Sequence, residues 1–460
     1  MSDVDVLVIG GGNAALCAAL SARRAGASVT LVERAPREWR GGNSKYTRNL
    51  RCVHDHSPPM TGRYTASELS EDLRAVTGDG SDPVLTELVI ERSREAPGFL
   101  EANGVKWQPP LNGTLQLGRT NRFFLGGGKA LVNRLFATAE RLGVRVHYDH
   151  AVDSLGFAGD SCTEVGIQTP QGRRTIRPRA VVAAAGGFEA NLEWLAESWG
   201  AAAANFFVRG ARQNDGTVLR ALLDAGAAER GNPRGFHGIA VDVRGPRFEG
   251  GIVTRVDSVP FGIMVNRDGE RFYDEGEDLW PKRYATWGRL IAEQPGQVAY
   301  SIFDAKVTRR FMATAMKPHH AETVSGLAER LAIDPHRLTA TVARFNAAVQ
   351  DGAYDTSRLD GCRTSGIVPP KSNWALRIDE PPFYAYPLGT GVTFTYLGVG
   401  VDTTTRVARR TGGVFENVFA AGEIMAGNVL LEGYLAGFGM TLGTVFGRLA
   451  GEQAAKHAAL

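Results

Sequence analysis

The first 33 residues alternate between apolar runs and a helical stretch. Residues 4–9 form a short apolar run, three glycines follow it, and residues 13–24 are rich in the helix formers Ala and Leu. Residues 28–32 are apolar and β-branched, and this second run ends at Glu33. The order predicts a complete strand–helix–strand unit, which joins parallel strands and implies a sheet covered by helices.

Further along the chain, the same patterns predict more strands and helices. Helices are expected over residues 67–77, 83–103, 130–142 and 216–225, and strands over 144–148 and 180–185. From residue 231 to 366 the pattern changes, with strand-like flanks around a turn at 266–269 and an amphipathic helix over 333–350. A strand over 414–421 and a helix over 440–457 return to the first pattern. We therefore predict an α/β fold with a parallel sheet and an inserted α+β domain.

Composition narrows the class of protein. The 460 residues are 43% hydrophobic and 22% charged, and a net charge of +3 gives no reason to expect nucleic-acid binding. The four cysteines are dispersed without a CxxC pair, so no metal site is predicted. The N-terminus lacks a basic leader, and no apolar run reaches the ~18 residues of a membrane helix. We therefore expect a cytoplasmic protein with reduced thiols.

The glycines after the first strand carry a dinucleotide-binding fingerprint, Gly10-x-Gly12-x-x-Ala15. Gly10 permits the tight turn, Gly12 lets the backbone approach a pyrophosphate, and Ala15 allows the helix to pack closely on the strand. Unpaired amides at the helix N-terminus favour phosphate binding. Glu33 is placed to accept hydrogen bonds from ribose hydroxyls, and its charge would repel a 2′-phosphate. The motif predicts a dinucleotide other than NADP.

A second glycine–acid segment near the other end of the chain favours FAD over NAD. The predicted strand over 414–421 leads into Gly422 and Glu423, where a carboxylate suits the ribityl hydroxyls of a flavin. FAD enzymes often build one binding site from segments at both ends of the chain. We therefore predict a Rossmann-like FAD-binding domain over residues 1–230 and 367–460, with a capping and substrate domain over 231–366.

With these motifs in view, the chain resembles the fumarate reductase/succinate dehydrogenase flavoprotein superfamily, and within it the tricarballylate dehydrogenase subgroup. The matching segments run along most of the chain and cover residues 10–19, 41–44, 47–52, 120–131, 185–191, 265–278, 420–428 and 433–440. The FAD contacts expected from the fingerprint and the resemblance are Gly10, Gly11, Gly12, Asn13, Ala14, Ala15, Glu33, Arg34, Gly41, Gly42, Asn43, Ser44, Ala185, Gly186, Asp215, Glu423, Gly437, Gly439 and Met440. Several relatives attach FAD through a histidine just before the Gly-Gly loop. No histidine lies between Glu33 and Gly41, so non-covalent FAD is expected.

Desaturating a CH–CH bond beside carboxylates requires a proton acceptor, a rigidly held substrate and cationic partners, for which arginine offers a bidentate fork. The resemblance implies that an arginine of the capping domain transfers the proton. This arginine follows a Gly-x-Arg-Phe turn, here residues 269–272, and Arg283 is the best match downstream. Asp268 and Arg271 would complete a proton path to it. The alternative is a solvated hairpin with surface arginines, because arginine is a poor base without help.

Two departures from the fumarate reductase pattern weaken the expectation of fumarate-type contacts. The histidine pair of that group is absent from residues 393–398, and Tyr434 lies near the position of a substrate-binding arginine. Tyr434 and Tyr396 are therefore candidates to polarise a carbonyl or to take a proton, as in ketosteroid dehydrogenases, with core packing as the alternative. Candidate carboxylate ligands in Gly- or Asn-rich loops are Arg48, Arg119, Arg122 and Lys129. Candidate histidine bases or donors are His54, His237, His319 and His320.

These observations predict an FAD-dependent oxidoreductase that dehydrogenates or reduces a CH–CH bond in a small, tricarballylate-like polycarboxylate, by hydride transfer to flavin N5. Because the chain has no cluster ligands, electrons are expected to pass to a separate iron–sulfur protein at the membrane. Two alternatives stay open. One is a desaturase or ene-reductase of a non-carboxylate carbonyl compound, and the other is a flavin-binding scaffold or sensor without turnover.

Overall fold

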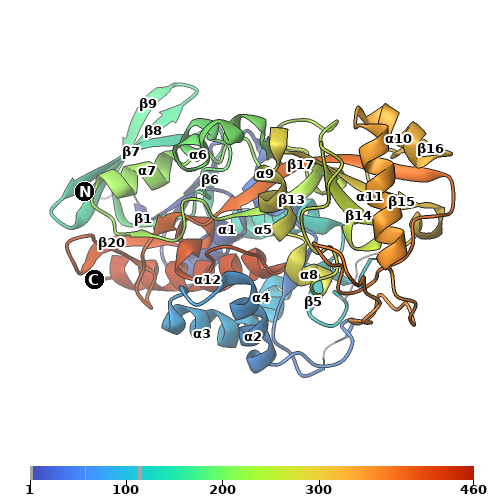
Figure 1. Ribbon diagram of the computed structural model, residues 1–460. Coiled ribbons are helices and arrows are strands. Elements are labelled where there is room, and N and C mark those ends of the chain that lie inside the picture. The colour runs from blue at the N-terminus through green and yellow to red at the C-terminus, as the bar shows by residue number, and fades with distance from the viewer. Residues whose placement is uncertain (1–3, 57, 112–116) are drawn as a thin grey trace.

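The computed structural model describes residues 4–56, 58–111 and 117–460. At its centre is a six-stranded sheet with the order β19-β20-β10-β1-β2-β6, parallel from β20 to β6, with β19 antiparallel to β20. Its strands are β1 (Val4–Ile9), β2 (Val29–Val32), β6 (Arg145–His147), β10 (Pro178–Ala183), β19 (Arg406–Ala408) and β20 (Val414–Ala420). Only β10 separates β1 from β20, so the two ends of the chain build one sheet (Figure 1). The predicted α/β class with a parallel sheet is confirmed.

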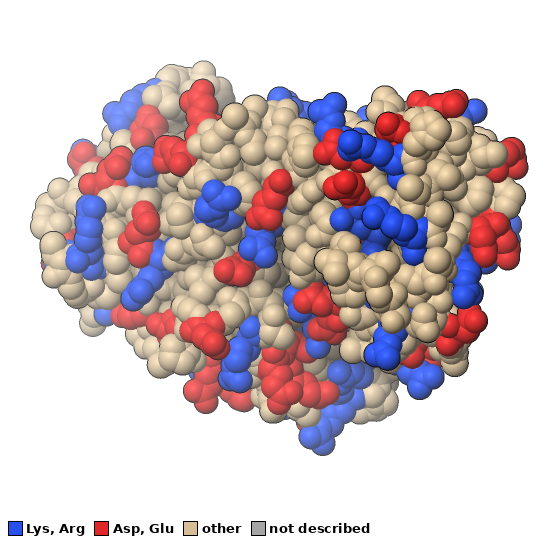
Figure 2. Space-filling view, viewed as in Figure 1, with Lys and Arg blue, Asp and Glu red and all other residues tan. Residues whose placement is uncertain are grey.

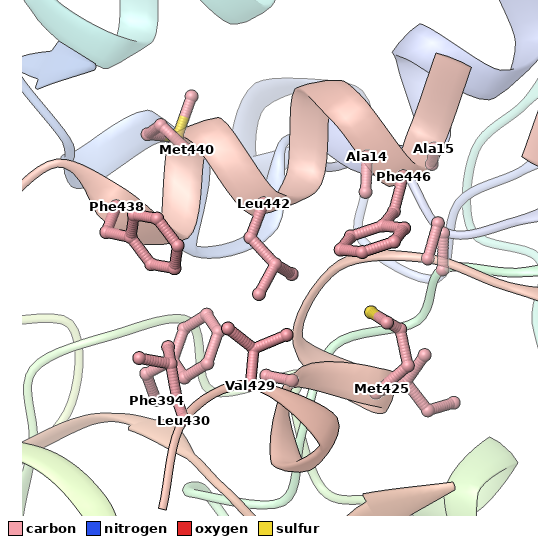
Figure 3. Packing of buried hydrophobic residues seen from close by; sticks show 14 of the residues in the cluster. Ala14, Ala15, Phe394, Met425, Val429, Leu430, Phe438, Met440, Leu442 and Phe446 are labelled. Atoms are coloured by element: carbon pink, nitrogen blue, oxygen red, sulfur yellow. The ribbon is translucent and has the colours of Figure 1, made fainter. Parts of the chain in front are cut away.

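The first and last long helices pack against each other beside this sheet. Helix α1 (Asn13–Arg24) meets α12 (Phe438–Ala458) at small residues, and a Cβ at Gly447 or Gly451 would collide with carbonyl oxygens of α1. Leu442 and Phe446 of α12 point toward the segment that follows β20, near Val429 and Met425 (Figure 3). The close approach of the two helices brings both of their N-termini to the same end of the sheet.

A second six-stranded sheet lies beside the first and contains the path β11-β17-β15-β14, with β13 and β16 also paired to β17. Its strands are β11 (Phe207–Val208), β13 (Phe236–Asp242), β14 (Ile263–Asn266), β15 (Val298–Asp304), β16 (His319–Ala321) and β17 (Phe383–Thr395). Helices α8 (Trp280–Arg283), α9 (Thr286–Ala292), α10 (Val324–Leu331) and α11 (Pro335–Ala348) belong to the same half of the molecule (Figure 1). Strands β11 and β17 fall outside the predicted capping segment 231–366, so the strand pairing does not follow those boundaries, and the domain division stays a prediction.

The remaining elements complete the first half of the molecule. They are α2 (Ala66–Thr77), α3 (Pro83–Arg92), α4 (Ala96–Ala102), α5 (Gly127–Arg141), α6 (Leu192–Trp199), α7 (Thr217–Asp224), β3 (Asn49–Arg51), β4 (Trp107–Gln108), β5 (Asn121–Phe124), β7 (Ala151–Ala158), β8 (Ser161–Thr169), β9 (Gly172–Ile176), β12 (Glu229–Arg230) and β18 (Gly398–Val399). The single helix expected over 83–103 is two helices joined by a 3₁₀ turn at Ser93–Glu95, because Pro97 in the first turn of α4 cannot donate a helical hydrogen bond. The antiparallel sheet β7-β8-β9 was not expected, since its half-exposed strands lack a clear apolar alternation.

The face shown in Figure 2 mixes lysine and arginine with aspartate and glutamate, as the small net charge suggests. Across the described residues, no helix combines the length and the apolar character needed to span a membrane. In the same part of the chain, no cluster of three or more His, Cys, Asp or Glu residues is arranged to hold a metal ion.

Candidate active site

A long cavity opens at the carboxyl ends of β1, β2, β10 and β20 and extends to β13 and β17 of the second sheet. Ligands of open α/β sheets bind at this edge, where strand order lets loops and helix N-termini converge. The cavity encloses about 1590 Å³, counted out to its open mouth. Its lining residues come both from the glycine turn after β1 and from β13 and β17 of the second sheet, so a dinucleotide at the first end leaves the second end for another small molecule.

Glycines shape the end of the cavity nearest β1. Gly10 has φ +112°, and a Cβ there would collide with the carbonyl oxygen of Ala184. A Cβ at Gly11 would collide with the carboxylate of Glu33, which is 6% exposed and accepts a 2.8 Å hydrogen bond from the amide of Ala35. Burial raises the pKa of Glu33. Bare backbone therefore faces the cavity beside a buried carboxyl group, as a pyrophosphate next to a ribose requires.

The loop after β2 and the N-terminus of α1 are tied together at this end. The amide of Asn13 donates to Oγ of Ser44 at 2.9 Å, and the N-cap residue of α1, Gly12, has no side chain to cap the first turn. Arg34 and Asp215 form an ion pair at 2.5 Å and both line the cavity. The hydrogen-bonding groups at this end of the cavity and its glycine-lined wall fit the phosphates and riboses of a dinucleotide.

All of the predicted FAD contacts except Ala15 and Gly41 line this cavity. Ala15 is fully buried in the core, where it allows α1 to pack closely (Figure 3). Gly41 has φ +103°, and a Cβ there would lie 2.7 Å from Cγ1 of Val132. Both residues thus shape the neighbouring backbone, and the cavity wall is formed by the residues next to them.

Three arginines line the other end of the cavity: Arg48, Arg209 and Arg255. Arg48 and Arg209 are 9% and 7% exposed. Burial, with a smaller effect of Arg255, lowers the pKa of both guanidinium groups to about 10. Arg255 pairs with the buried Asp257 at 2.6 Å, whereas neither Arg48 nor Arg209 forms an ion pair within the described residues. This end of the cavity therefore carries an excess of positive charge.

Aromatic side chains that face the same space include His237, Tyr284 and Tyr434. His237 stacks on Tyr434 with ring centroids 3.9 Å apart and meets Tyr284 edge-on at 5.5 Å. Burial, then Arg209 and Arg255, lower the pKa of His237 well below its usual range, so its imidazole is neutral. The hydroxyl of Tyr434 accepts a 2.8 Å hydrogen bond from the amide of Gly439, which leaves its O–H proton available as a donor.

Comparison with known proteins identifies the family. A family model described as an FAD binding domain matches residues 5–441. The chain belongs to this family of flavoproteins. The flavoprotein is 28% identical over 475 residues to a probable fumarate reductase of Shewanella frigidimarina, covering 98% of this chain and 75% of that protein. It is 26% identical over 552 residues to 4-oxocyclohexanecarboxylate 2-dehydrogenase of Sinomonas cyclohexanicum, covering 100% and 94% of the two chains.

A solved structure shares the fold of the flavoprotein. The 3-ketosteroid-Δ4-(5α)-dehydrogenase of Rhodococcus jostii RHA1, in complex with 4-androstene-3,17-dione, matches with a TM-score of 0.76 at 22% identity. The match covers 99% of this chain and 98% of that chain. Together these findings confirm the predicted superfamily, the FAD cofactor and the class of an FAD-dependent oxidoreductase acting on CH–CH bonds.

The predicted catalytic residues of the capping segment lie outside the residues that line the cavity. Arg283 forms an ion pair with Glu277 at 3.1 Å. Arg271 pairs with Glu275 and donates to the carbonyl of Pro369 at 2.7 Å. Asp268 is exposed in the turn after β14. Arg271 is thus a buried partner of Glu275, unlike the surface arginine of the alternative, and the catalytic roles of Arg283, Arg271 and Asp268 stay predictions.

The neighbour of Arg283 reaches the cavity instead. Successive residues of a helix point about 100° apart, so at the end of α8 Tyr284 faces inward where Arg283 does not. Of the two tyrosines proposed from sequence, Tyr434 lines the cavity, whereas Tyr396 is fully buried behind it and donates to the carbonyl of Gly433 at 2.8 Å.

Of the four predicted carboxylate ligands, only Arg48 lines the cavity. Arg119 is an exposed partner of Glu68 at 2.8 Å, Arg122 donates to the carbonyl of Pro58 at 3.2 Å, and Lys129 is exposed at the start of α5. Sequence analysis missed Arg209, Arg255 and Tyr284. Arg209 follows a strand of only two residues, and Arg255 lies between short irregular segments, so no periodic pattern marks either one.

Proposed function

We propose that the flavoprotein dehydrogenates or reduces a CH–CH bond in a small polycarboxylate of the tricarballylate type. The observation that carries the proposal is the group Arg48, Arg209 and Arg255, balanced locally by the single carboxylate of Asp257. Buried charges without partners are costly, so a cavity that keeps them is suited to an anionic ligand. Arginine also matches the planar fork of a carboxylate.

The residues of the cavity supply orientation and proton transfer. The three arginines hold the carboxylates and fix the reacting carbons. FAD, when bound, would supply the site that accepts or donates the hydride. Tyr284 is our candidate for the proton-transfer group. The guanidinium carbon of Arg255 lies 4.1 Å from the centre of its ring. Burial raises the pKa of Tyr284, and the positive charges of Arg255, Arg209 and Arg48 oppose that rise and stabilise a phenolate.

A second candidate function is favoured by Tyr434. Its hydroxyl has its acceptor side occupied by the amide of Gly439, so it can donate a hydrogen bond to a carbonyl oxygen of a substrate. Two relatives are named for carbonyl compounds. They are 4-oxocyclohexanecarboxylate 2-dehydrogenase, whose named compound is also a carboxylate, and the 3-oxosteroid 1-dehydrogenase of Mycobacterium tuberculosis, which is 26% identical over 335 residues. We keep a carbonyl compound as the alternative substrate class, with Tyr434 polarising the carbonyl.

Anaerobic stopped-flow reduction of the holoprotein separates the two candidates. The compounds tested are tricarballylate, succinate, 4-oxocyclohexanecarboxylate and a saturated 3-ketosteroid. Loss of flavin absorbance measures the reduction of the flavin by each compound. Fast bleaching by tricarballylate, reduced in R209M, supports the first proposal. Fast bleaching by the ketosteroid alone, unaffected by R209M and abolished by Y434F, replaces it with the second.

The remaining expectations are proposals of the same kind. We propose that FAD is held without a covalent bond, because no histidine precedes the Gly41–Gly42 loop. Acid precipitation should therefore release all of the flavin into the supernatant. We also keep the proposals of a cytoplasmic location and of a separate iron–sulfur electron partner at the membrane. A purified complex or a reconstituted electron transfer assay tests the latter.

A further inference from the structure

Two buried glutamates meet at the wall of the flavin cavity. Glu189 follows β10 and is fully buried, and Glu423 follows the neighbouring strand β20 and is 7% exposed. Glu423 lines the cavity, whereas Glu189 lies behind it. Because β10 and β20 are parallel neighbours, their carboxyl ends bring the two side chains to the same place.

The side chain of Asn43 bridges the two carboxyl groups. Its Oδ1 accepts from the amide of Ala211 at 2.8 Å, so its Nδ2 must be the donor on the other side. Nδ2 lies 2.6 Å from Oε1 of Glu189 and 3.2 Å from Oε2 of Glu423. Asn214 donates a further hydrogen bond to Oε1 of Glu189 at 2.8 Å. The two carboxyl groups are therefore held side by side by neutral donors.

Among the described residues, neither glutamate takes part in an ion pair, and Oε2 of Glu189 is buried without a hydrogen-bond donor. The titratable groups facing Glu423 from the neighbouring segments are Tyr396 and Tyr434. Burial raises the pKa of both phenols, so they add no charge.

Arg209 reaches the pair only indirectly. Nε of Arg209 donates to Oγ1 of Thr393 at 2.9 Å, and the carbonyl of Thr393 accepts from Asn43. The other carboxyl oxygen of Glu423, Oε1, accepts from the amide of Thr395 at 2.8 Å. These bonds fix the geometry of the pair without compensating two negative charges.

We propose that Glu189 and Glu423 hold one proton between them and together carry a single negative charge at the wall of the flavin cavity. Two ionised carboxylates in contact, out of water and without a cation, repel each other too strongly for both to stay charged. A proton between them also satisfies the orphan oxygen of Glu189. In line with this arrangement, burial and contact with Glu189 raise the pKa of Glu423 well above its usual range. Glu189 is thus a positioning residue, which holds the shared proton against Glu423.

The shared proton has a consequence for the bound flavin. As long as the pair keeps its proton, one negative charge faces the cavity. When the pH rises far enough to remove that proton, a second negative charge appears near the flavin and makes its reduction less favourable. The midpoint potential of the flavin should therefore fall at high pH more steeply than the flavin's own protons require.

Infrared spectroscopy of the holoprotein labelled with ¹³C-carboxyl glutamate tests the proposal directly. At pH 8 the wild type should show a labelled carboxylic acid C=O band that is lost in E189Q and equally in E423Q. The exposed Glu197→Gln is the matched control and should leave the band intact. A wild type without a protonated-glutamate band, or an E189Q variant that keeps the full band, would overturn the shared proton.

Spectroelectrochemistry measures the midpoint potential of the flavin as a function of pH. A purely structural role of Glu189 would leave this pH dependence unchanged. The extra fall of the flavin potential at high pH should be present in the wild type and absent from E189Q, which cannot carry two charges. Parallel potential curves for the two proteins would contradict the proposal. If E189Q does not fold, E423Q and the wild-type infrared titration decide the question, because both report on the same proton.

Discussion

Arg209 offers a test in which stability and ligand binding should change in opposite directions. Its guanidinium is 7% exposed, forms no ion pair within the described residues, and donates from Nε to Oγ1 of Thr393 at 2.9 Å. We consider the substitution Arg209→Met, which keeps the length of the side chain and removes the charge. The variant should be more stable than the wild type and should bind anionic substrates less tightly.

The magnitudes follow from the surroundings of the guanidinium. Burial lowers the pKa of Arg209 from 12.5 to about 10. With ~1.4 kcal/mol for each pKa unit, holding this charge costs the fold about 3 kcal/mol. Losing the hydrogen bond to Thr393 lowers the free energy of unfolding by about 1 kcal/mol. The variant should therefore be more stable than the wild type by about 2 kcal/mol in total. Losing a charge-assisted bond to a substrate carboxylate costs roughly 1.5–3 kcal/mol, or about 10- to 100-fold in affinity.

Urea unfolding of the holoprotein gives the stability, and perturbation of the flavin spectrum by tricarballylate gives the dissociation constant. The control is Arg283→Met, which removes an arginine that does not line the cavity and should leave the dissociation constant unchanged. An R209M protein that is less stable than the wild type, or one that binds tricarballylate with unchanged affinity, would refute the assigned role of Arg209.

Three further predictions concern other parts of the structure. Arg283→Ala should keep turnover within about threefold, whereas Tyr284→Phe should lower kcat about 100-fold or more, as expected for loss of a proton-transfer group. Steady-state kinetics measures both variants. A larger loss in Arg283→Ala than in Tyr284→Phe would make Arg283 the proton-transfer group again. Burial lowers the pKa of Lys371 from 10.5 to about 8. Between pH 8 and pH 10.5 the unfolded chain therefore binds more protons than the folded chain. The free energy of unfolding of the wild type should rise across this range by up to about 3 kcal/mol relative to that of Lys371→Met. The same pH dependence of urea unfolding in both proteins would contradict this prediction. A Cβ at Gly187 would collide with two side-chain oxygens, so Gly187→Ala should weaken FAD binding by at least tenfold in a fluorescence titration of the apoprotein, whereas Gly98→Ala, where nothing lies within 4 Å, should bind normally.

The sequence by itself determined the dinucleotide half of the molecule. A strand, a glycine turn and a helix follow one another within 24 residues, and the chemistry of this unit depends on neighbours in the chain. Gly10, Gly12 and Glu33 could therefore be predicted as dinucleotide contacts from spacing alone, and all three line the cavity. The Gly422–Glu423 segment was predicted at the same site because FAD enzymes often close one site from both ends of the chain, and in the structure it lines the same cavity.

Only the tertiary structure decided which charged side chains meet beyond the flavin. Arg48, Arg209 and Arg255 lie on three segments far apart in the chain, and the second sheet and its loops bring them together. Sequence spacing could not tell Arg283 from Tyr284 either, since one step along a helix turns a side chain by about 100°. Local spacing fixes the direction of a side chain within its own element, whereas its partners depend on how separate elements pack.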